Sequence, residues 1–199
     1  MTIITLSREL GSGGDDVAAL VAERLGLRRV GREIINRAAQ AAGAGEAALA
    51  EIDELGLLRV KPSPATMKLY REKVHAIIEE QAREGNVLLV GRGGQVVLAQ
   101  RRDVLHVRIF APRDLRCANV QARCGIPSEA SAARVDASDR ARALFHRRAY
   151  GVRWDDPALY DVVLNMANLS VPAAAAIIIA AAGAQAEMNR SFTPEGCEE

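Results

Sequence analysis

A glycine-rich turn near the N-terminus carries the clearest chemical signal in this chain. Gly11, Ser12, Gly13 and Gly14 follow a short apolar run and precede a helical pattern of residues. A strand, a glycine-rich turn and a helix N-terminus form a cradle for phosphate, because backbone N–H groups point into the turn and the helix dipole favours an anion. The pattern therefore predicts a phosphate-binding loop. A glycine-rich turn without a ligand is the alternative interpretation.

The side chains of this loop depart from the full phosphate-binding motif GxxxxGK(S/T). When Gly13 is taken as the second glycine, Arg8 stands at the first glycine, Gly14 at the lysine and Asp15 at the hydroxyl residue. Our hypothesis is that Arg8 supplies the missing cation. Asp15 and Asp16 either stabilise the dipole of the helix that they begin or hold Mg²⁺ beside a bound nucleotide.

Arginine supplies nearly all of the positive charge, and phosphoryl transfer needs cations around the moving phosphate. Of the 26 basic residues, three are lysines: Lys61, Lys68 and Lys73. A phosphate site elsewhere in the chain must use arginine, whose planar guanidinium binds two phosphate oxygens at once. Gly91 and Arg92 directly follow an apolar run, at the end of a predicted strand where ligands of parallel α/β sheets collect. The alternative for Arg92 is an ordinary surface turn.

A polar stretch over residues 128–150 predicts a long helix rich in arginine. Arg140 and Arg142 are its first candidates for binding phosphate, as parts of a mobile lid that closes over the site and excludes water. Asp136 and Asp139 lie among the arginines at spacings that also allow ion pairs within the helix. The alternative interpretation is therefore a solvated helix stabilised by its own ion pairs.

Short apolar runs alternate with helical spacings along the chain, and these elements must position the candidate residues. Because the runs are apolar throughout, they predict strands of a parallel sheet that is covered on both faces. The expected strands are residues 2–6, 27–30, 86–90, 104–110 and 161–164. The expected helices are residues 15–25, 32–42, 46–58, 65–83, 96–99, 112–124 and 128–150, and a last helix capped by Ser170.

Composition places the chain among ordinary globular proteins. Its 199 residues are 49% apolar and 26% charged, and a net charge of +1 gives no electrostatic basis for a nucleic-acid partner. Three cysteines without a CxxC pair predict free thiols in a reducing compartment, and no signal peptide is recognisable. The most apolar stretch, residues 171–182, is too short to span a bilayer and predicts a buried helix that ends at Gly183. We therefore expect a cytoplasmic protein without a membrane partner.

The opening ITLSRELGSGGDDVAALVAERLG resembles that of the cytidylate kinase-like proteins, relatives of bacterial cytidylate kinase in the nucleoside monophosphate kinase group. The resemblance continues with REII at residues 32–35, NVLLVGRGG at 86–94 and WDDPALYDVVLN at 154–165, and it covers residues 2 to 182. It implies an α/β fold of the P-loop NTPase type, a three-layer sandwich with a five-stranded parallel sheet and helical acceptor-binding and lid regions.

The resemblance also implies roles for individual residues. Arg92, with Gly91, would hold the phosphate of the acceptor, and Arg32 would begin the acceptor-binding region. Asp139 and Arg142 resemble the lid aspartate and arginine of the family. Two positions depart from the family pattern, because Gly93 stands where the family has an aspartate after the arginine and Gly31 precedes Arg32.

Residues and resemblance together predict a kinase that moves the γ-phosphoryl group of ATP, with Mg²⁺, to a nucleoside monophosphate, CMP being the first candidate. The alternatives are a catalytically weak nucleotide-binding or regulatory module with a degenerate loop, and a small-molecule kinase with a non-nucleotide acceptor. We expect one domain over residues 1–188, with an acceptor-binding region at 31–84 and a lid-like region at 126–156. A flexible tail is expected from 189 to 199.

Overall fold

The computed structural model describes residues 1–31, 35–37, 40–44 and 63–191. Arg32, the expected helix at 46–58 and residues 192–199 of the expected tail lie outside the described residues.

Five parallel strands form a single sheet, as the apolar runs predict. They are β1 (Ile3–Arg8), β2 (Arg28–Val30), β3 (Val87–Val90), β4 (Val104–Phe110) and β5 (Val162–Asn165), in the order β2-β3-β1-β4-β5. In the register, Leu6 of β1 pairs with Val90 of β3, and Arg8 pairs with Ile109 of β4. The carboxyl ends of β3, β1 and β4 therefore lie side by side.

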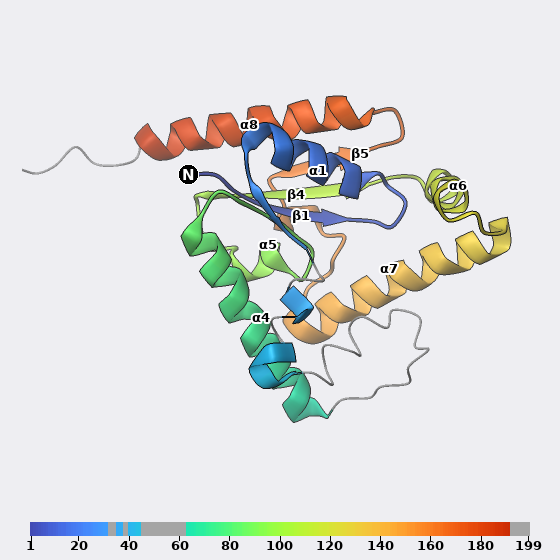
Figure 1. Cartoon of the computed structure of the whole chain (residues 1–199), viewed down its shortest axis with the longest axis horizontal. Coiled ribbons are helices and arrows are strands. Elements are labelled where there is room, and N and C mark those ends of the chain that lie inside the picture. The colour runs from blue at the N-terminus through green and yellow to red at the C-terminus, as the bar shows by residue number, and fades with distance from the viewer. Residues whose placement is uncertain (32–34, 38–39, 45–62, 192–199) are drawn as a thin grey trace, which may run out of the picture.

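Helices cover both faces of the sheet, which gives three layers (Figure 1). On one face lie α1 (Gly14–Leu25) and α8 (Val171–Ser191), and on the other lie α4 (Pro64–Glu84), α5 (Gly94–Val97) and α7 (Ser128–Tyr150). The helix α6 (Arg113–Cys124) lies beyond the carboxyl ends of β1 and β4. Two short helical segments, Gln40–Ala44 and Pro157–Leu159, complete the described elements.

The two faces of β1 differ in polarity, and this difference positions the site. Ile4 and Leu6 point into an apolar cluster with α1 and α8. Thr5 and Ser7 point to the other face, where Thr5 Oγ1 lies 2.7 Å from Nδ1 of His106 and Ser7 Oγ accepts a hydrogen bond of 2.7 Å from the indole of Trp154. The sheet therefore carries polar groups on the face beneath α7.

The last helix is longer than its sequence predicts. The helix α8 passes through Gly183, where a side chain would meet no atom within 4 Å, and continues to Ser191. By length and composition alone, its residues 171–189 are long and apolar enough to cross a membrane. Ala174, Ala175 and Ile178 on one side are fully buried against the sheet and α1, whereas Ile177 is 41% exposed.

Asn189, where the tail is predicted to begin, lies within α8 and donates a hydrogen bond of 3.3 Å to the carbonyl of Arg102. The prediction that the helix ends at Gly183 is therefore wrong, because nothing at that glycine stops the backbone hydrogen bonding.

Candidate active site

The glycine loop occupies residues 9–13, between the end of β1 and the start of α1. Gly11 and Gly13 both have φ of +79°, a left-handed conformation that glycine adopts without the clash of a Cβ atom. The side chain of Ser12 stabilises the conformation of the loop. Its Oγ donates a hydrogen bond to the carbonyl of Glu9 at 2.8 Å and accepts one from the N–H of Gly14 at 3.4 Å.

Backbone N–H groups of this loop are available to an anion. Within the described residues, the N–H groups of Gly13 and Asp15 have no hydrogen-bond partner, and both lie at the N-terminus of α1. Because α1 is a regular helix of 12 residues, its dipole adds to the positive potential there. The backbone of the predicted phosphate cradle is therefore present.

Arg8 occupies the space that the motif's lysine would need. A Cβ atom at Gly14 would lie 2.6 Å from Cβ of Arg8, so no side chain fits at position 14 while Arg8 keeps its place. The guanidinium of Arg8 reaches toward the turn after β3, where its Nη1 would lie 3.3 Å from a Cβ atom at Gly91. The cation of this loop therefore comes from the end of the strand, and it lies between the loop and the Gly91 turn.

Both carboxylates of the first helical turn are paired with arginines. Asp15 Oδ1 accepts a hydrogen bond of 2.9 Å from Nε of Arg8, and Asp16 pairs with Arg123 of α6 at 3.2 Å. Their charges are thus compensated at the loop. No cluster of three or more carboxylate, histidine or cysteine side chains suited to a metal ion occurs among the described residues.

Arg92 lies in a strained turn at the end of β3. Gly91, Arg92 and Gly93 all have positive φ, at 82°, 56° and 74°. Such a conformation costs a non-glycine residue on the order of 1 kcal/mol and is concentrated at functional sites. The Arg92 side chain is 7% exposed, and its Cζ lies 5.2 Å from the ring centre of Phe145.

Tyr150, at the end of α7, accounts for the glycine at position 93. A Cβ atom there would lie 2.4 Å from Cε2 of the Tyr150 ring. The Tyr150 hydroxyl donates a hydrogen bond of 3.1 Å to the carbonyl of Arg92, and its ring stacks on His75 of α4 at 5.5 Å. The Tyr150 ring therefore fills the space that a side chain at position 93 would need.

The lid candidates of α7 separate in the structure. Arg142 is half-buried, contacts Ser138 and lies with Cζ 5.8 Å from the ring centre of Trp154. Arg140 is exposed. Asp139 pairs with Arg116 of α6 at 2.8 Å, rather than within its own helix as the spacing allows.

Arg108 of β4 is a site residue that our sequence reasoning missed. Its side chain is buried, with Cζ 4.3 Å from the ring centre of Trp154, and it donates to Oε1 of Glu9 at 3.0 Å. A charged residue inside the apolar run VLHVRIF was the available signal, because a buried arginine needs a partner. Glu9, Arg116 and Gln95 were also missed.

His146 shows how positive this region is. Burial and the neighbouring charges of Arg92, Arg108 and Arg142 together lower the pKa of His146 to about 4. Its Nδ1 donates to the carbonyl of Arg142 at 2.9 Å, so the neutral ring accepts from Gln95 Nε2 through Nε2 at 3.2 Å. Three arginines therefore surround one neutral imidazole, beside the carboxyl ends of the strands.

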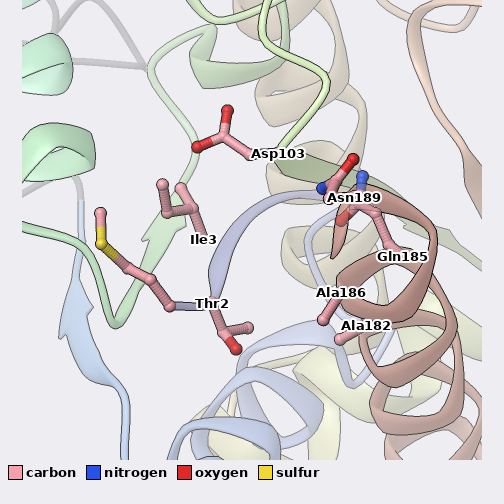
Figure 2. Close-up of a pocket in the computed structure, with 8 residues that line it drawn as sticks. Thr2, Ile3, Asp103, Ala182, Gln185, Ala186 and Asn189 are labelled. Carbon is pink, nitrogen blue, oxygen red and sulfur yellow. The ribbon is translucent and has the colours of Figure 1, made fainter. Parts of the chain in front are cut away.

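The pocket in Figure 2 lies at the opposite edge of the sheet, where β1 begins and α8 ends. Its volume of about 10 Å³ is room for one water molecule. The candidate site is therefore the arginine-rich region beside the glycine loop and not this pocket.

Comparison with known proteins agrees with this geometry. The family model described as the cytidylate kinase-like family matches residues 3–168. The chain belongs to this family. It is 29% identical over 168 residues to a protein of Ignicoccus hospitalis named cytidylate kinase, covering 84% of this chain and 91% of that protein.

Solved structures with the same fold include an uncharacterised protein from Eubacterium ventriosum, with a TM-score of 0.74, 20% identity, and coverage of 92% of this chain and 99% of that one. A shikimate kinase from Bacteroides thetaiotaomicron has a TM-score of 0.52 at 12% identity and covers 89% of this chain and 95% of its own. The fold of this cytidylate kinase-like chain is therefore the P-loop kinase fold that its sequence predicts.

Proposed function

We propose that this protein transfers the γ-phosphoryl group of ATP to a nucleoside monophosphate. The observation that carries the proposal is the gathering of Arg8, Arg92, Arg108 and Arg142 around the carboxyl ends of β1, β3 and β4, beside the glycine loop. Phosphoryl transfer is catalysed mainly by positioning and by cations around the transferring group, and this arrangement supplies both.

The donor would bind at the loop from Gly11 to Gly14. The N–H groups of Gly13 and Asp15 would bind phosphate oxygens, and the N-terminus of α1 would stabilise their charge. Arg8 would break its ion pair with Asp15, and its guanidinium would then bind the β- and γ-phosphates. A lysine has this role in the full motif. Arg142 and the exposed Arg140 would neutralise the group in transfer from the side of α7.

The acceptor phosphate would bind to Arg92 at the Gly91 turn. The Arg8 guanidinium already reaches this turn, so donor and acceptor phosphates would meet between the two arginines. CMP is the first acceptor to test, because the related proteins are named cytidylate kinases. Arg32 is proposed as a second acceptor ligand on the same resemblance.

The residues present fit ATP better than they fit a metal ion held by protein alone. Mg²⁺ would arrive bound to the phosphates and would supply further charge neutralisation there. Asp15 occupies the place of the motif's hydroxyl residue and is the carboxylate that would face the ion once Arg8 turns to the phosphates.

The test is a coupled assay of ADP release with ATP, Mg²⁺ and each of CMP, UMP, AMP and GMP. We expect release that depends on the acceptor and is fastest with CMP. The Arg92→Lys variant keeps the charge but loses the planar fork, so its KM for the acceptor should rise about tenfold with little change in the KM for ATP. No acceptor-dependent release, together with no ATP binding in calorimetry, would refute the proposal.

A further inference from the structure

The helix α6 lies between the glycine loop and α7 (Figure 1). Asn119 Nδ2 donates a hydrogen bond of 2.8 Å to the carbonyl of Gly11, and Arg123 pairs with Asp16 at 3.2 Å. A Cβ atom at Gly11 would lie 2.5 Å from the carbonyl oxygen of Arg116, so the loop rests directly on the α6 backbone. One side of α6 therefore packs directly against the glycine loop and the start of α1.

Arg116 connects this side of α6 to α7. Its side chain is 7% exposed, and its Nε lies 3.1 Å from Oε2 of Glu9, the first residue of the loop. Its Nη1 donates to the carbonyl of Leu10 at 3.5 Å, and Nη1 and Nη2 bind the two carboxylate oxygens of Asp139 at 3.0 and 2.8 Å. One guanidinium thus holds two loop residues and one residue of α7.

Glu9 is held through both its side chain and its backbone. Its Oε1 accepts from Arg108 at 3.0 Å, and its Oε2 accepts from the N–H of Ala111 at 3.3 Å. Its backbone N–H donates to the carbonyl of Ile109 at 3.1 Å. A movement of the loop at Glu9 must therefore displace Arg116 or break a bond between charged, nearly buried groups.

A second arginine–aspartate pair joins α6 to α7 without touching the loop. Nε and Nη2 of Arg113 both donate to Asp136 at 2.8 Å, so this pair also has two hydrogen bonds, and it lies three residues earlier on each helix. Arg113 is half-exposed, and within the described residues it makes no hydrogen bond or ion pair with the glycine loop. The pair of Arg113 and Asp136 is therefore a matched control for the pair of Arg116 and Asp139.

We propose that Arg116 is a positioning residue that couples the glycine loop to α7 through Glu9 and Asp139. A nucleotide bound at the loop then determines the position of the Arg142 side chain. Arg142 follows Asp139 by three residues on α7 and lies against Trp154. The inference deepens the proposed function, because it rests on the loop being the nucleotide site. It gives Asp139, which resembles the lid aspartate of the family, a positioning role.

The test compares Asp139→Asn with Asp136→Asn, each of which removes one carboxylate charge from an α6–α7 pair with little change in shape. Asp139→Asn should raise the KM for ATP and lower kcat, each about tenfold, which is the usual size of a coupling between sites. Asp136→Asn should stay within about twofold of the wild type in both constants, because a surface ion pair contributes little. Asp139→Glu, which keeps the charge, should recover part of the loss.

Fluorescence gives a readout that does not need turnover. The chain has a single tryptophan, Trp154, which packs against Arg108 and Arg142. ATP with Mg²⁺ should change its emission in the wild type and in Asp136→Asn, and the change should be at least halved in Asp139→Asn.

The possible failures are distinguishable. If ATP binds and is turned over but the two variants behave alike in KM, kcat and fluorescence, the coupling is refuted and the proposed function stands. If the wild type binds no ATP in calorimetry, the proposed function fails and the coupling fails with it. Folding of Asp139→Asn is checked by its thermal unfolding, and it is expected because Arg116 keeps Glu9 and two carbonyl groups as partners.

Discussion

At the scale of single residues, the loop has an arginine at the end of the strand and a glycine where the full motif has its lysine on the helix. The stem of Arg8 fills the space above Gly14, so the two positions form one steric unit. A cation at residue 8 requires a glycine at residue 14, and a lysine at residue 14 requires a glycine at residue 8, because the clash is between the two Cβ atoms. The absence of the motif's lysine is therefore one half of an exchange, and the other half is the arginine at the first glycine of the motif.

This exchange predicts that restoring the lysine alone is harmful. Gly14→Lys should destabilise the fold by about 1–3 kcal/mol, because its Cβ would lie 2.6 Å from Cβ of Arg8. Arg8→Gly should raise the KM for ATP by about tenfold or more through loss of a charge-assisted phosphate contact. The double variant Arg8→Gly/Gly14→Lys restores the first glycine and the lysine of the motif, and it should recover stability and most of the kcat/KM for ATP. Thermal unfolding and steady-state kinetics measure both effects, and a single Gly14→Lys variant as stable as wild type would contradict the steric argument.

At the scale of elements, the sequence predicts the strands and the helices α4 and α7 well, whereas α8 continues beyond its expected end at Gly183. Continuous apolar runs predict a parallel sheet because both of its faces are covered, and the bounds of α7 at residues 128 and 150 agree with the expected ones. The glycine loop and the Arg92 turn also lie where the pattern places them. These features depend on local periodicity, which a single sequence contains.

The contacts of α6 could not be predicted in the same way. Asp136 and Asp139 have arginines at helical spacing on α7, yet they pair with Arg113 and Arg116, which are 23 residues away. That choice depends on how α6 packs between the loop and α7, and no periodic signal in the sequence reports it. The same holds for Glu9, whose partner Arg108 lies 99 residues along the chain.

The packing of the end of α7 on the turn after β3 gives a prediction at this scale. Gly93→Asp should destabilise the fold by about 1–3 kcal/mol, because the new side chain meets the Tyr150 ring. Tyr150→Ala should relieve most of that clash, so the double variant should be more stable than the sum of the single effects predicts. Gly125→Asp is the matched control, since Gly125 also has a left-handed φ of +63° but no atom within 4 Å of its Cβ position. Urea unfolding measures all four variants, and additive effects at 93 and 150 would argue against the contact.

At the scale of the whole molecule, the two faces of the sheet bury different kinds of side chain. The face beneath α1 and α8 buries a continuous apolar cluster that includes Ile4, Leu6 and Ile178. The face beneath α7 buries polar groups, Ser7, Arg108 and His146 among them, next to its own apolar cluster. Buried polar groups of this kind add little to the stability of the fold, but the fold is strongly destabilised when one partner changes its charge. We therefore expect the pH dependence of stability to arise on this face.

His146 determines the direction of that effect. Its pKa of about 4 in the folded protein lies below the usual 6.5, so the unfolded chain takes up a proton first as the pH falls. Stability should therefore decrease between pH 6.5 and pH 4 by about 1.4 kcal/mol per pH unit from this group, or about 3 kcal/mol in all. In His146→Gln, which cannot titrate but can still accept from Gln95, the same interval should show a correspondingly weaker pH dependence. Urea unfolding of both proteins at half-unit steps of pH measures the difference, and parallel curves would mean that His146 is charged in the fold, which three neighbouring arginines oppose.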